Sequence, residues 1–364
     1  MSNLLFISGL TAGSFVLTAV AIPFIKRLAW SLGLVDDPAG GEHKSHRRPV
    51  PYGGGMAIYL GVLFPVIVAL LYALREAVTR SGGLALGAGA FLGVDETSML
   101  LGCASVLFLI GLLDDWKGLT PLPRFLIEVV TAAILVIEFP EFRFCGDSLP
   151  LLGGLLSVIW IVAMTNAFNF LDNMDGLTAG IAVIATLALA AIALDVDHLP
   201  AAILCFVLAG ATVAFLIYNF PPASVFMGDA GGLFLGFAAA GLSLLASHHA
   251  AADYPGFAPR LAPLLVLAVP VYDLVSVVAI RIRAGVPVWV ADNNHVSHRL
   301  VRLGLTRRNA VLFIYAVSLV SSGAAVFLVG APAAMAWAVG GGLALATAVA
   351  ARLELRRPPR AEGP

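Results

Sequence analysis

The feature of this sequence that most constrains its fold is the recurrence of long apolar runs. Stretches of about 17 to 25 residues, each long enough to cross a bilayer as a helix, follow one another along the chain of 364 residues. Because 60% of the residues are hydrophobic and 12% are charged, a soluble domain would lack polar surface. We predict an all-α, polytopic integral membrane protein with about eleven spans, near residues 4–24, 53–73, 97–113, 124–139, 151–168, 178–194, 200–217, 231–247, 261–282, 309–328 and 333–351.

The basic residues predict how the chain is oriented in the bilayer. With the N-terminus outside, 17 of the 21 Lys and Arg residues fall on the inner side, and only Arg75, Arg80, Arg143 and Arg260 fall outside. Because Lys and Arg favour the cytoplasmic side of a membrane, we predict an N-out, C-in arrangement with an odd number of spans. Residues 1–352 are predicted to form a single transmembrane domain, followed by a disordered cytoplasmic tail over residues 353–364.

The acidic and His-rich clusters gather on the predicted inner side. They occur in the segments near 25–52, 114–123, 169–177, 218–230 and 283–308. Polar groups at membrane depth are expensive and mark functional sites. A transporter is the competing interpretation, but its site usually lies near the bilayer midplane. Crowding on one face favours an enzyme that joins a water-soluble substrate to a lipid-borne one.

The remaining histidines and the cysteines give no comparable pattern. His248 and His249 lie toward an outer loop without a partner cluster, and we expect them to be ordinary interfacial residues. Cys103, Cys145 and Cys205 are scattered in or beside apolar segments, with neither metal-binding nor disulfide spacing. We expect them to act as small buried apolar residues.

The densest polar segment is the run of residues 166–177, which has two carboxylates and three carboxamides within ten residues. On a helix, neighbours such as Asn169 and Asp172 share a face, whereas the first and last polar residues do not. We expect the helix to end near Gly176, with Asp172 and Asp175 on an irregular turn that lines a cavity.

Two further acidic clusters lie at span ends. Asp114 and Asp115 form a carboxylate pair suited to Mg²⁺ coordination or general-base chemistry, with a solvated helix end as the alternative. Asp229 stands between Gly228 and Ala230 after a Pro-rich turn, and Phe226 is an aromatic residue beside it. An aromatic next to an acid can stack on a base above a metal-bound diphosphate, although a simple Pro-Gly connector has the same composition.

Two cationic clusters complete the set. The first is a phosphate clamp or a positive-inside anchor, and it contains Lys44, His46 and Arg47. The second combines protonatable and phosphate-binding groups, and it contains His295, His298 and Arg299. The histidine spacing is compatible with a metal pair, but a phosphate contact beside a Mg²⁺ site fits better because no zincin-type Glu accompanies it. Asp273 fits a structural role and a site role equally well.

Together these motifs resemble a known family. From about Asp37 to Gly304 the chain is similar to the polyprenyl-phosphate N-acetylhexosamine-1-phosphate transferases of glycosyltransferase family 4. The motifs that carry the resemblance are KSHRRPVPYGG, LDDWKGL, NAFNFLDNMDGL, VFMGDAG and NHVSHRL. The resemblance implies transfer of a sugar-1-phosphate from a UDP-sugar to undecaprenyl phosphate, with release of UMP and a need for Mg²⁺, for which Mn²⁺ is an alternative. It also implies a homodimer, no nucleic-acid partner, and a bacterial cytoplasmic membrane with the active site facing the cytoplasm.

The resemblance also implies roles for individual residues. Asp229 and Asp175 would bind the metal, and Asp114 would deprotonate or orient the lipid phosphate. The implied catalytic residues are Asp114, Asp115, Asp229, His295 and His298. The implied substrate-binding residues are Lys44, His46, Arg47, Asn169, Asp172, Asn173, Met174, Asp175, Asn219, Phe226 and Arg299, with Phe226 on uracil.

Departures from the family pattern refine the expected substrate. Ser297 replaces a common His, Tyr52 a common basic residue and Glu128 a common Gln. The Gly-rich and His-containing motifs resemble the branch that uses UDP-N-acetylglucosamine, for cell-wall or surface-polysaccharide synthesis, more than the branch that uses a UDP-muramoyl-peptide. A phosphatidyltransferase acting on CDP-alcohols is less compatible, because its Ala-Arg and later aspartate pair are missing after Asp175–Gly176.

Overall fold

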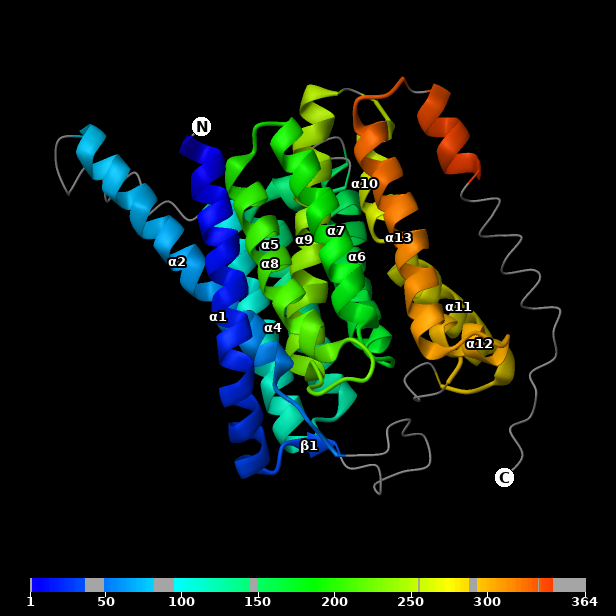
Figure 1. The fold of residues 1–364 in the computed structure, drawn as a ribbon. Coiled ribbons are helices and arrows are strands. Elements are labelled where there is room, and N and C mark those ends of the chain that lie inside the picture. Colours follow the sequence, from blue (N-terminus) through cyan, green and yellow to red (C-terminus); the bar gives the residue numbers. More distant parts are fainter. Residues whose placement is uncertain are drawn as a thin grey trace.

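The computed structural model describes residues 2–36, 49–81, 95–144, 149–254, 256–287, 293–332 and 334–342. These residues form a bundle of helices with one two-stranded antiparallel sheet, in which Val35 pairs with Pro51 and Asp36 with Val50 (Figure 1). The elements are α1 (Ser2–Leu32), β1 (Val35–Asp36), β2 (Val50–Pro51), α2 (Gly54–Ser81), α4 (Glu96–Lys117), α5 (Pro121–Glu138), η2 (Pro140–Phe142), α6 (Pro150–Leu171), α7 (Leu177–Asp195), α8 (Leu199–Asn219), α9 (Gly228–Asp253), α10 (Ala258–Val266), α11 (Ala268–Ala284), α12 (Val296–Arg302) and α13 (Arg307–Val329).

The helices confirm the prediction of an all-α polytopic membrane protein. Within the described part of the chain, eight helices are long and apolar enough to span a membrane, or nine if one bent pair counts as a span. The predicted span at 124–139 is a helix, α5, but it carries Arg124, Glu128 and Glu138 and is not among these eight. The predicted last span is described as helix only over residues 334–342. The prediction of eleven spans and that of N-out orientation stay predictions.

One predicted span is broken. The continuous helix expected near 261–282 is instead α10 and α11, which meet at Leu267 with a bend of 67°. Pro270 explains the break, because it has no N–H to donate to Val266 and its ring clashes with that carbonyl. The break turns α11 and its polar residues toward the end of the bundle that also holds α12 (Figure 1).

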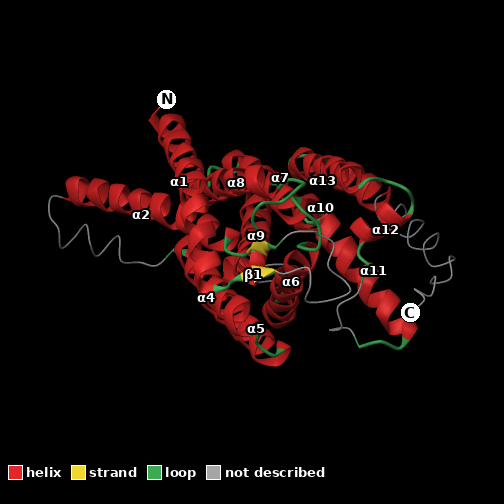
Figure 2. Cartoon of the chain, turned by 60° about the horizontal axis from the view of Figure 1, so that its bottom comes forward, coloured by secondary structure: helices red, strands yellow, loops and turns green. Residues whose placement is uncertain are grey.

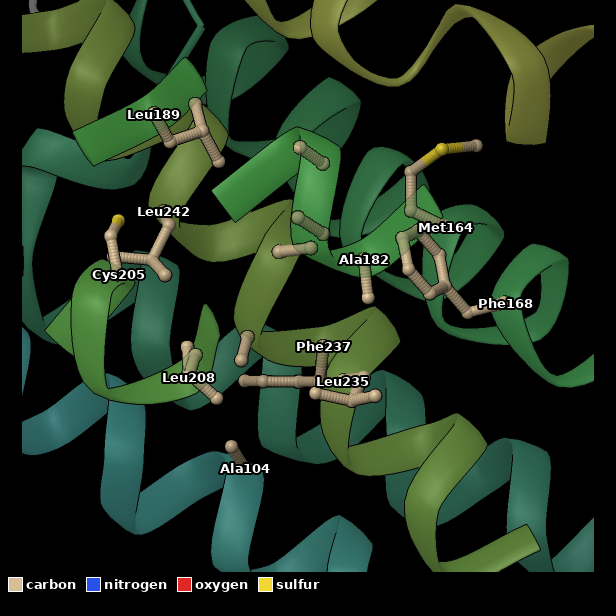
Figure 3. Packing of buried hydrophobic residues seen from close by; sticks show 14 of the residues in the cluster. Ala104, Met164, Phe168, Ala182, Leu189, Cys205, Leu208, Leu235, Phe237 and Leu242 are labelled. Carbon is tan, nitrogen blue, oxygen red and sulfur yellow. The ribbon is translucent and has the colours of Figure 1, made fainter. Parts of the chain in front are cut away.

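Helix α9 forms the centre of the bundle. The apolar stretch of α9 that is long enough to span a membrane is entirely buried. The helix packs against α4, α6, α2, α7 and α10. A helix that is apolar on every side has to be surrounded by other helices. Figure 3 shows part of this packing, with Met164 and Phe168 of α6, Leu235 and Phe237 of α9, and Leu208 of α8. The first residues of α9 are therefore held by several helices at once.

The outer helices present apolar side chains outward. Leu151 is 90% exposed, and Val320 and Leu4 are also largely exposed. Such a surface is expected where side chains contact lipid rather than water. Inside the bundle, Cys103 and Cys205 are buried and unpaired, as the sequence predicts, whereas Cys145 lies outside the described residues.

Glycines allow the helices to approach α9 closely. A Cβ at Gly55 would lie 2.3 Å from the backbone nitrogen of Gly231, so α2 and α9 are in backbone contact there. A Cβ at Gly111 would lie 2.6 Å from the backbone of Ala230, which brings α4 equally close. Small residues at helix contacts are a common way of packing helices within membranes.

We expect Gly55→Ala to destabilise the protein by about 1–3 kcal/mol, because the added methyl group meets backbone that cannot move aside. The measurement is thermal unfolding of the purified protein in detergent. Gly102→Ala is the matched control, since nothing lies within 4 Å of a Cβ at that exposed position of α4. Equal melting temperatures for the two variants would show that the contact between α2 and α9 is not close.

Candidate functional site

The polar clusters meet around the N-terminus of α9, at the end of the bundle that comes forward in Figure 2. Asp229 stands in the first turn of this helix, and its side chain is 34% exposed. Asp115, near the end of α4, accepts hydrogen bonds from the backbone N–H groups of Asp229 and Ala230, at 2.8 and 3.1 Å. A carboxylate at a helix N-terminus satisfies free N–H groups and interacts favourably with the helix dipole. Asp115 thus joins the end of α4 to the start of α9.

Gly228 is required for this arrangement. Its φ of +76° lies in the left-handed region that favours glycine. In addition, a Cβ at this position would lie 2.5 Å from the Asp115 carboxylate. The Gly-Asp pair of the VFMGDAG motif therefore has a structural reason: the glycine makes room for one carboxylate and the next residue supplies another.

Arg124 of α5 connects three carboxylates. Its Nη1 lies 2.8 Å from Asp114 and 3.6 Å from Asp229, and its Nε lies 3.6 Å from Glu128. The other oxygen of Asp114 accepts a hydrogen bond from the N–H of Leu119 at 2.7 Å. Both oxygens of Asp114 are thus engaged, so in this structure Asp114 holds Arg124 and the α4–α5 turn in place.

None of the sequence motifs pointed to Arg124 as a site residue; it was one of the basic residues on the predicted inner side. Its position in the sequence carried a signal, because it follows Asp115 by nine residues and precedes Glu128 by four. On a helix, residues four apart lie on the same face.

The asparagines of α6 face the same cluster. Asn169 donates a short hydrogen bond to Asp229, and Asn166 donates one to the buried Glu128. Helix α6 ends at Leu171, five residues earlier than predicted, and Asp172 and Asp175 do lie on the irregular turn that follows. Asn169 is therefore placed to orient the Asp229 carboxylate.

Asp172 extends the acidic cluster. It accepts a hydrogen bond from the backbone N–H of Gly228. Burial raises the pKa of Asp172 to about 7, and repulsion from Asp229, Asp115 and Asp175 adds to this effect. Several carboxylates thus share a small region in which their negative charge is only partly compensated.

The turn after α6 is tied to the loop before α9. Asn219 is buried, accepts a hydrogen bond from the N–H of Gly176 and donates one to the carbonyl of Val225, both at 2.9 Å. Asp175 accepts a hydrogen bond from the N–H of Ala223 at 2.9 Å. Asn219 is accordingly a positioning residue in this structure, because both ends of its amide are used within the protein.

Two aromatic rings border the cluster. The backbone of Phe226 bonds to Pro51 and Gly54, each at 2.9 Å, which attaches this loop to β2 and the start of α2. The partly exposed ring of Phe226 lies 6.2 Å from that of Tyr52, at 51°. Burial and the negative charges of Asp36, Asp115 and Asp229 raise the pKa of Tyr52, so its hydroxyl stays protonated. Met174, in contrast, is buried in the hydrophobic core.

The His-containing motif is held by α11. Asp273 is buried, and its two oxygens contact Nδ1 of His295 and the N–H of Val296, each at 2.6 Å. In the structure Asp273 therefore holds the ring of His295 and the start of α12 in place. The ring of His295 lies 6.3 Å from that of Phe170 at the end of α6. The His-containing motif therefore lies beside the end of α6.

Other residues of the His-containing motif hydrogen-bond to the turn after α6 and to α11. Ser297 donates a hydrogen bond to Asn173 at 2.7 Å, which links α12 to the turn after α6. Arg299 donates to the carbonyl of Asn294 and to Ser276 of α11, at 3.0 and 2.9 Å. Burial, followed by the positive charges of His295, Arg302 and Arg307, lowers the pKa of His298, which is therefore neutral near pH 7.

Met174, predicted to bind substrate, packs in the hydrophobic core instead. The other predicted site residues fall into two described groups and one that lies outside the described residues. Around the start of α9 lie Asp114, Asp115, Asn169, Asp172, Asp175, Asn219, Phe226 and Asp229. Around α12 lie Asn173, His295, His298 and Arg299. Lys44, His46 and Arg47 lie outside the described residues. The described groups form one polar surface with clustered carboxylates, an arginine, imidazoles and a partly exposed aromatic ring, a combination suited to a phosphorylated ligand and a hard cation.

The sequence of this chain is similar to those of known proteins. Residues 97–247 match the model of glycosyl transferase family 4. The chain is 32% identical to the probable undecaprenyl-phosphate N-acetylglucosaminyl 1-phosphate transferase of Bacillus subtilis, over 86% of this chain and 83% of that protein. It is 32% identical to a decaprenyl-phosphate N-acetylglucosaminephosphotransferase of Mycobacterium tuberculosis, over 87% and 81%. It is 27% identical to the undecaprenyl-phosphate alpha-N-acetylglucosaminyl 1-phosphate transferase of Escherichia coli K12, over 88% and 83%.

These matches confirm the resemblance read from the motifs, and they extend well beyond the motif residues. These relatives align with 86–88% of the chain and not only with its motifs. The protein belongs to glycosyl transferase family 4.

Proposed function

We propose that this protein transfers N-acetylglucosamine-1-phosphate from UDP-N-acetylglucosamine to undecaprenyl phosphate and releases UMP. The observation that carries the proposal is the meeting of Asp115, Asp172 and Asp229 beside Arg124 at one end of a membrane-spanning bundle. A site at a membrane end is accessible both to a water-soluble nucleotide sugar and to the phosphate of a lipid. The names of the relatives support N-acetylglucosamine as the sugar and a polyprenyl phosphate as the acceptor.

A Mg²⁺ ion fits the residues of this site. The donors are carboxylate oxygens of Asp229 and Asp172, and Mg²⁺ is commonly held by one or two carboxylates together with water and substrate phosphates. Burial raises the pKa of Asp172, and the charges of Asp229, Asp115 and Asp175 raise it further; a bound dication would relieve this repulsion. We propose that Asp229 and Asp172 hold the ion, with Asp175 nearby. When bound, Mg²⁺ neutralises the diphosphate and stabilises the departing phosphate.

The chain's own residues then position the substrates. The Arg124 guanidinium supplies positive charge beside the acidic cluster, toward the diphosphate. The half-exposed ring of Phe226 offers a face for uracil. We propose that His298, together with His295 held by Asp273, contacts phosphate oxygens. These contacts favour a geometry in which two phosphates approach in line, which is most of what phosphoryl transfer requires.

In the proposed step, an oxygen of the lipid phosphate attacks the phosphorus that carries the sugar. The bond from that phosphorus to the bridging oxygen breaks, and UMP leaves with the oxygen. The attacking phosphate is already anionic at neutral pH, so no side chain has to remove a proton from it. The proposal therefore uses Asp114 as a positioning residue for Arg124, consistent with its two engaged oxygens.

The distribution of basic residues supports a location for this reaction. With 17 of 21 Lys and Arg residues on the side that carries the site, we propose that the site faces the cytoplasm from the bacterial inner membrane. UDP-sugars are made in the cytoplasm, so this orientation would give the site direct access to its donor.

The decisive experiment is a product assay with the purified full chain. It combines Mg²⁺, undecaprenyl phosphate and radiolabelled UDP-N-acetylglucosamine. We expect one lipid-linked sugar diphosphate for each UMP formed, complete loss of product on addition of EDTA, and recovery when Mg²⁺ or Mn²⁺ is returned in excess. A UDP-muramoyl-peptide is the comparison donor, and preferential use of it would assign the chain to the other branch. Failure with every UDP-amino sugar would refute the proposed function.

A further inference from the structure

A second polar cluster lies at the end of the bundle opposite the acidic site. It consists of Glu96 in the first turn of α4, His198 at the N-cap of α8 and His249 near the end of α9. The Nε2 atom of His198 lies 2.8 Å from Oε1 of Glu96, and Nε2 of His249 lies 3.8 Å from the same oxygen. The two imidazole rings are 4.1 Å apart. The expectation that His249 is an ordinary interfacial residue without partners is therefore wrong.

One ring nitrogen of this cluster has no hydrogen-bond partner among the described residues. Nε2 of His249 is inaccessible to solvent and makes no hydrogen bond. Buried polar atoms are almost always paired, so an unpaired ring nitrogen beside a second imidazole and a carboxylate indicates a ligand at this point.

We infer that Glu96, His198 and His249 bind a divalent transition-metal ion of the zinc type. The three ligand atoms all lie within 4.8 Å of one another. In a tetrahedral zinc site, with bonds of about 2.0–2.2 Å, ligand atoms are separated by roughly 3.4 Å. The observed separations of 2.8 and 3.8 Å lie on either side of that value, so small rotations of the side chains suffice.

The composition of the cluster distinguishes it from the Mg²⁺ site proposed above. Two imidazoles with one carboxylate favour zinc and neighbouring transition metals, whereas Mg²⁺ favours oxygen ligands alone. The two sites are also far apart. Glu96 and Asp115 lie 19 positions apart on one helix, a distance of roughly 28 Å at 1.5 Å per residue.

The hydrogen bonds around His198 show what binding would change. Its Nδ1 accepts a hydrogen bond from the N–H of Ala201 at 3.2 Å, so in this state Nε2 carries the ring proton and donates it to Glu96. A metal bound at Nε2 requires the proton to move to Nδ1, and the long bond to Ala201 is then lost. The neutral ring keeps its single proton, so this shift releases none. In exchange, the ion would join the ends of α4, α8 and α9.

The test uses the purified full chain with its affinity tag removed. The protein is equilibrated with buffered Zn²⁺ in the presence of excess Mg²⁺, passed through a desalting column and analysed for metal. We expect about one zinc ion per chain in the wild type and a loss of most of it in His249→Ala and His198→Ala. His248→Ala is the matched control, because His248 neighbours His249 on α9 but is not part of the ligand set.

A second measurement reports the ligands directly. Tetrahedral Co²⁺ has strong visible absorption bands, and we expect them on titration of the wild type and their loss in Glu96→Gln, which keeps the size of the side chain. Thermal unfolding with and without Zn²⁺ identifies variants that fail to fold, and the wild type is expected to melt at a higher temperature with the ion. Zinc content far below one per chain, or full content in both His249→Ala and Glu96→Gln, would overturn the inference.

Discussion

Asp229→Asn is expected to lower the rate of sugar-phosphate transfer by about three orders of magnitude, which corresponds to roughly 4 kcal/mol of lost transition-state stabilisation. The substitution removes one negative charge from the proposed Mg²⁺ site while it keeps an oxygen that can accept the hydrogen bond from Asn169. The measurement is the initial rate of lipid-linked product formation at saturating Mg²⁺. The same assay over a range of Mg²⁺ concentrations should show weaker apparent metal affinity.

The control for this prediction is Asp253→Asn, at the exposed far end of the same helix. It removes the same charge from α9 and is expected to leave the rate unchanged. Asp229→Asn should also fold normally, because it relieves repulsion among Asp229, Asp115 and Asp172. A well-folded Asp229→Asn variant with a rate close to wild type would remove Asp229 from the catalytic site.

Arg124→Met is expected to reduce stability by about 3–5 kcal/mol. The side chains of Asp114 and Glu128 are 8% and 1% exposed, so loss of the guanidinium leaves two carboxylates with little solvation and no cation. The cost of an uncompensated buried charge generally exceeds the value of the ion pair itself. The measurement is thermal unfolding in detergent, alongside the rate of product formation.

A combined variant separates electrostatics from packing. Adding Asp114→Asn and Glu128→Gln to Arg124→Met removes the stranded charges and is expected to restore much of the lost stability, without restoring activity. With the Asp114→Asn/Glu128→Gln variant measured as well, the cycle gives the coupling energy between Arg124 and the two carboxylates. If Arg124→Met melts at the wild-type temperature, or if the added substitutions destabilise it further, Arg124 does not compensate these carboxylates.

Much of the architecture was predictable because it depends on local composition. A run of apolar residues partitions into a bilayer whatever its neighbours are, so the helical segments could be located from the sequence. The same logic placed Asp114, Asp115, Asp172 and Asp229 at helix ends, where charged groups reach water. The bend at Leu267 was missed, although Pro270 carried the signal for it.

The roles of individual acids were less predictable. Asp114 and Asp115 are adjacent in sequence, but neighbouring residues on a helix point about 100° apart. One faces Arg124 of α5 and the other the N-terminus of α9, and only the packing of α4 between these helices distinguishes them. The sequence showed Glu96, His198 and His249 as three unrelated residues, because they are separated by 102 and 51 positions along the chain.

By itself, the sequence determined that the chain spans a membrane, where its polar motifs lie along the helices, and which family it resembles. Those properties follow from hydropathy and from short motifs, which need no knowledge of distant contacts. Only the tertiary structure decided that Arg124 belongs to the site, that Asp115 and Asn219 hold its loops together, and that a second cluster joins the opposite ends of α4, α8 and α9. The reason is physical: these interactions depend on side chains that meet only after the helices have packed around α9, and the backbone contacts that fix this packing are set by the whole bundle.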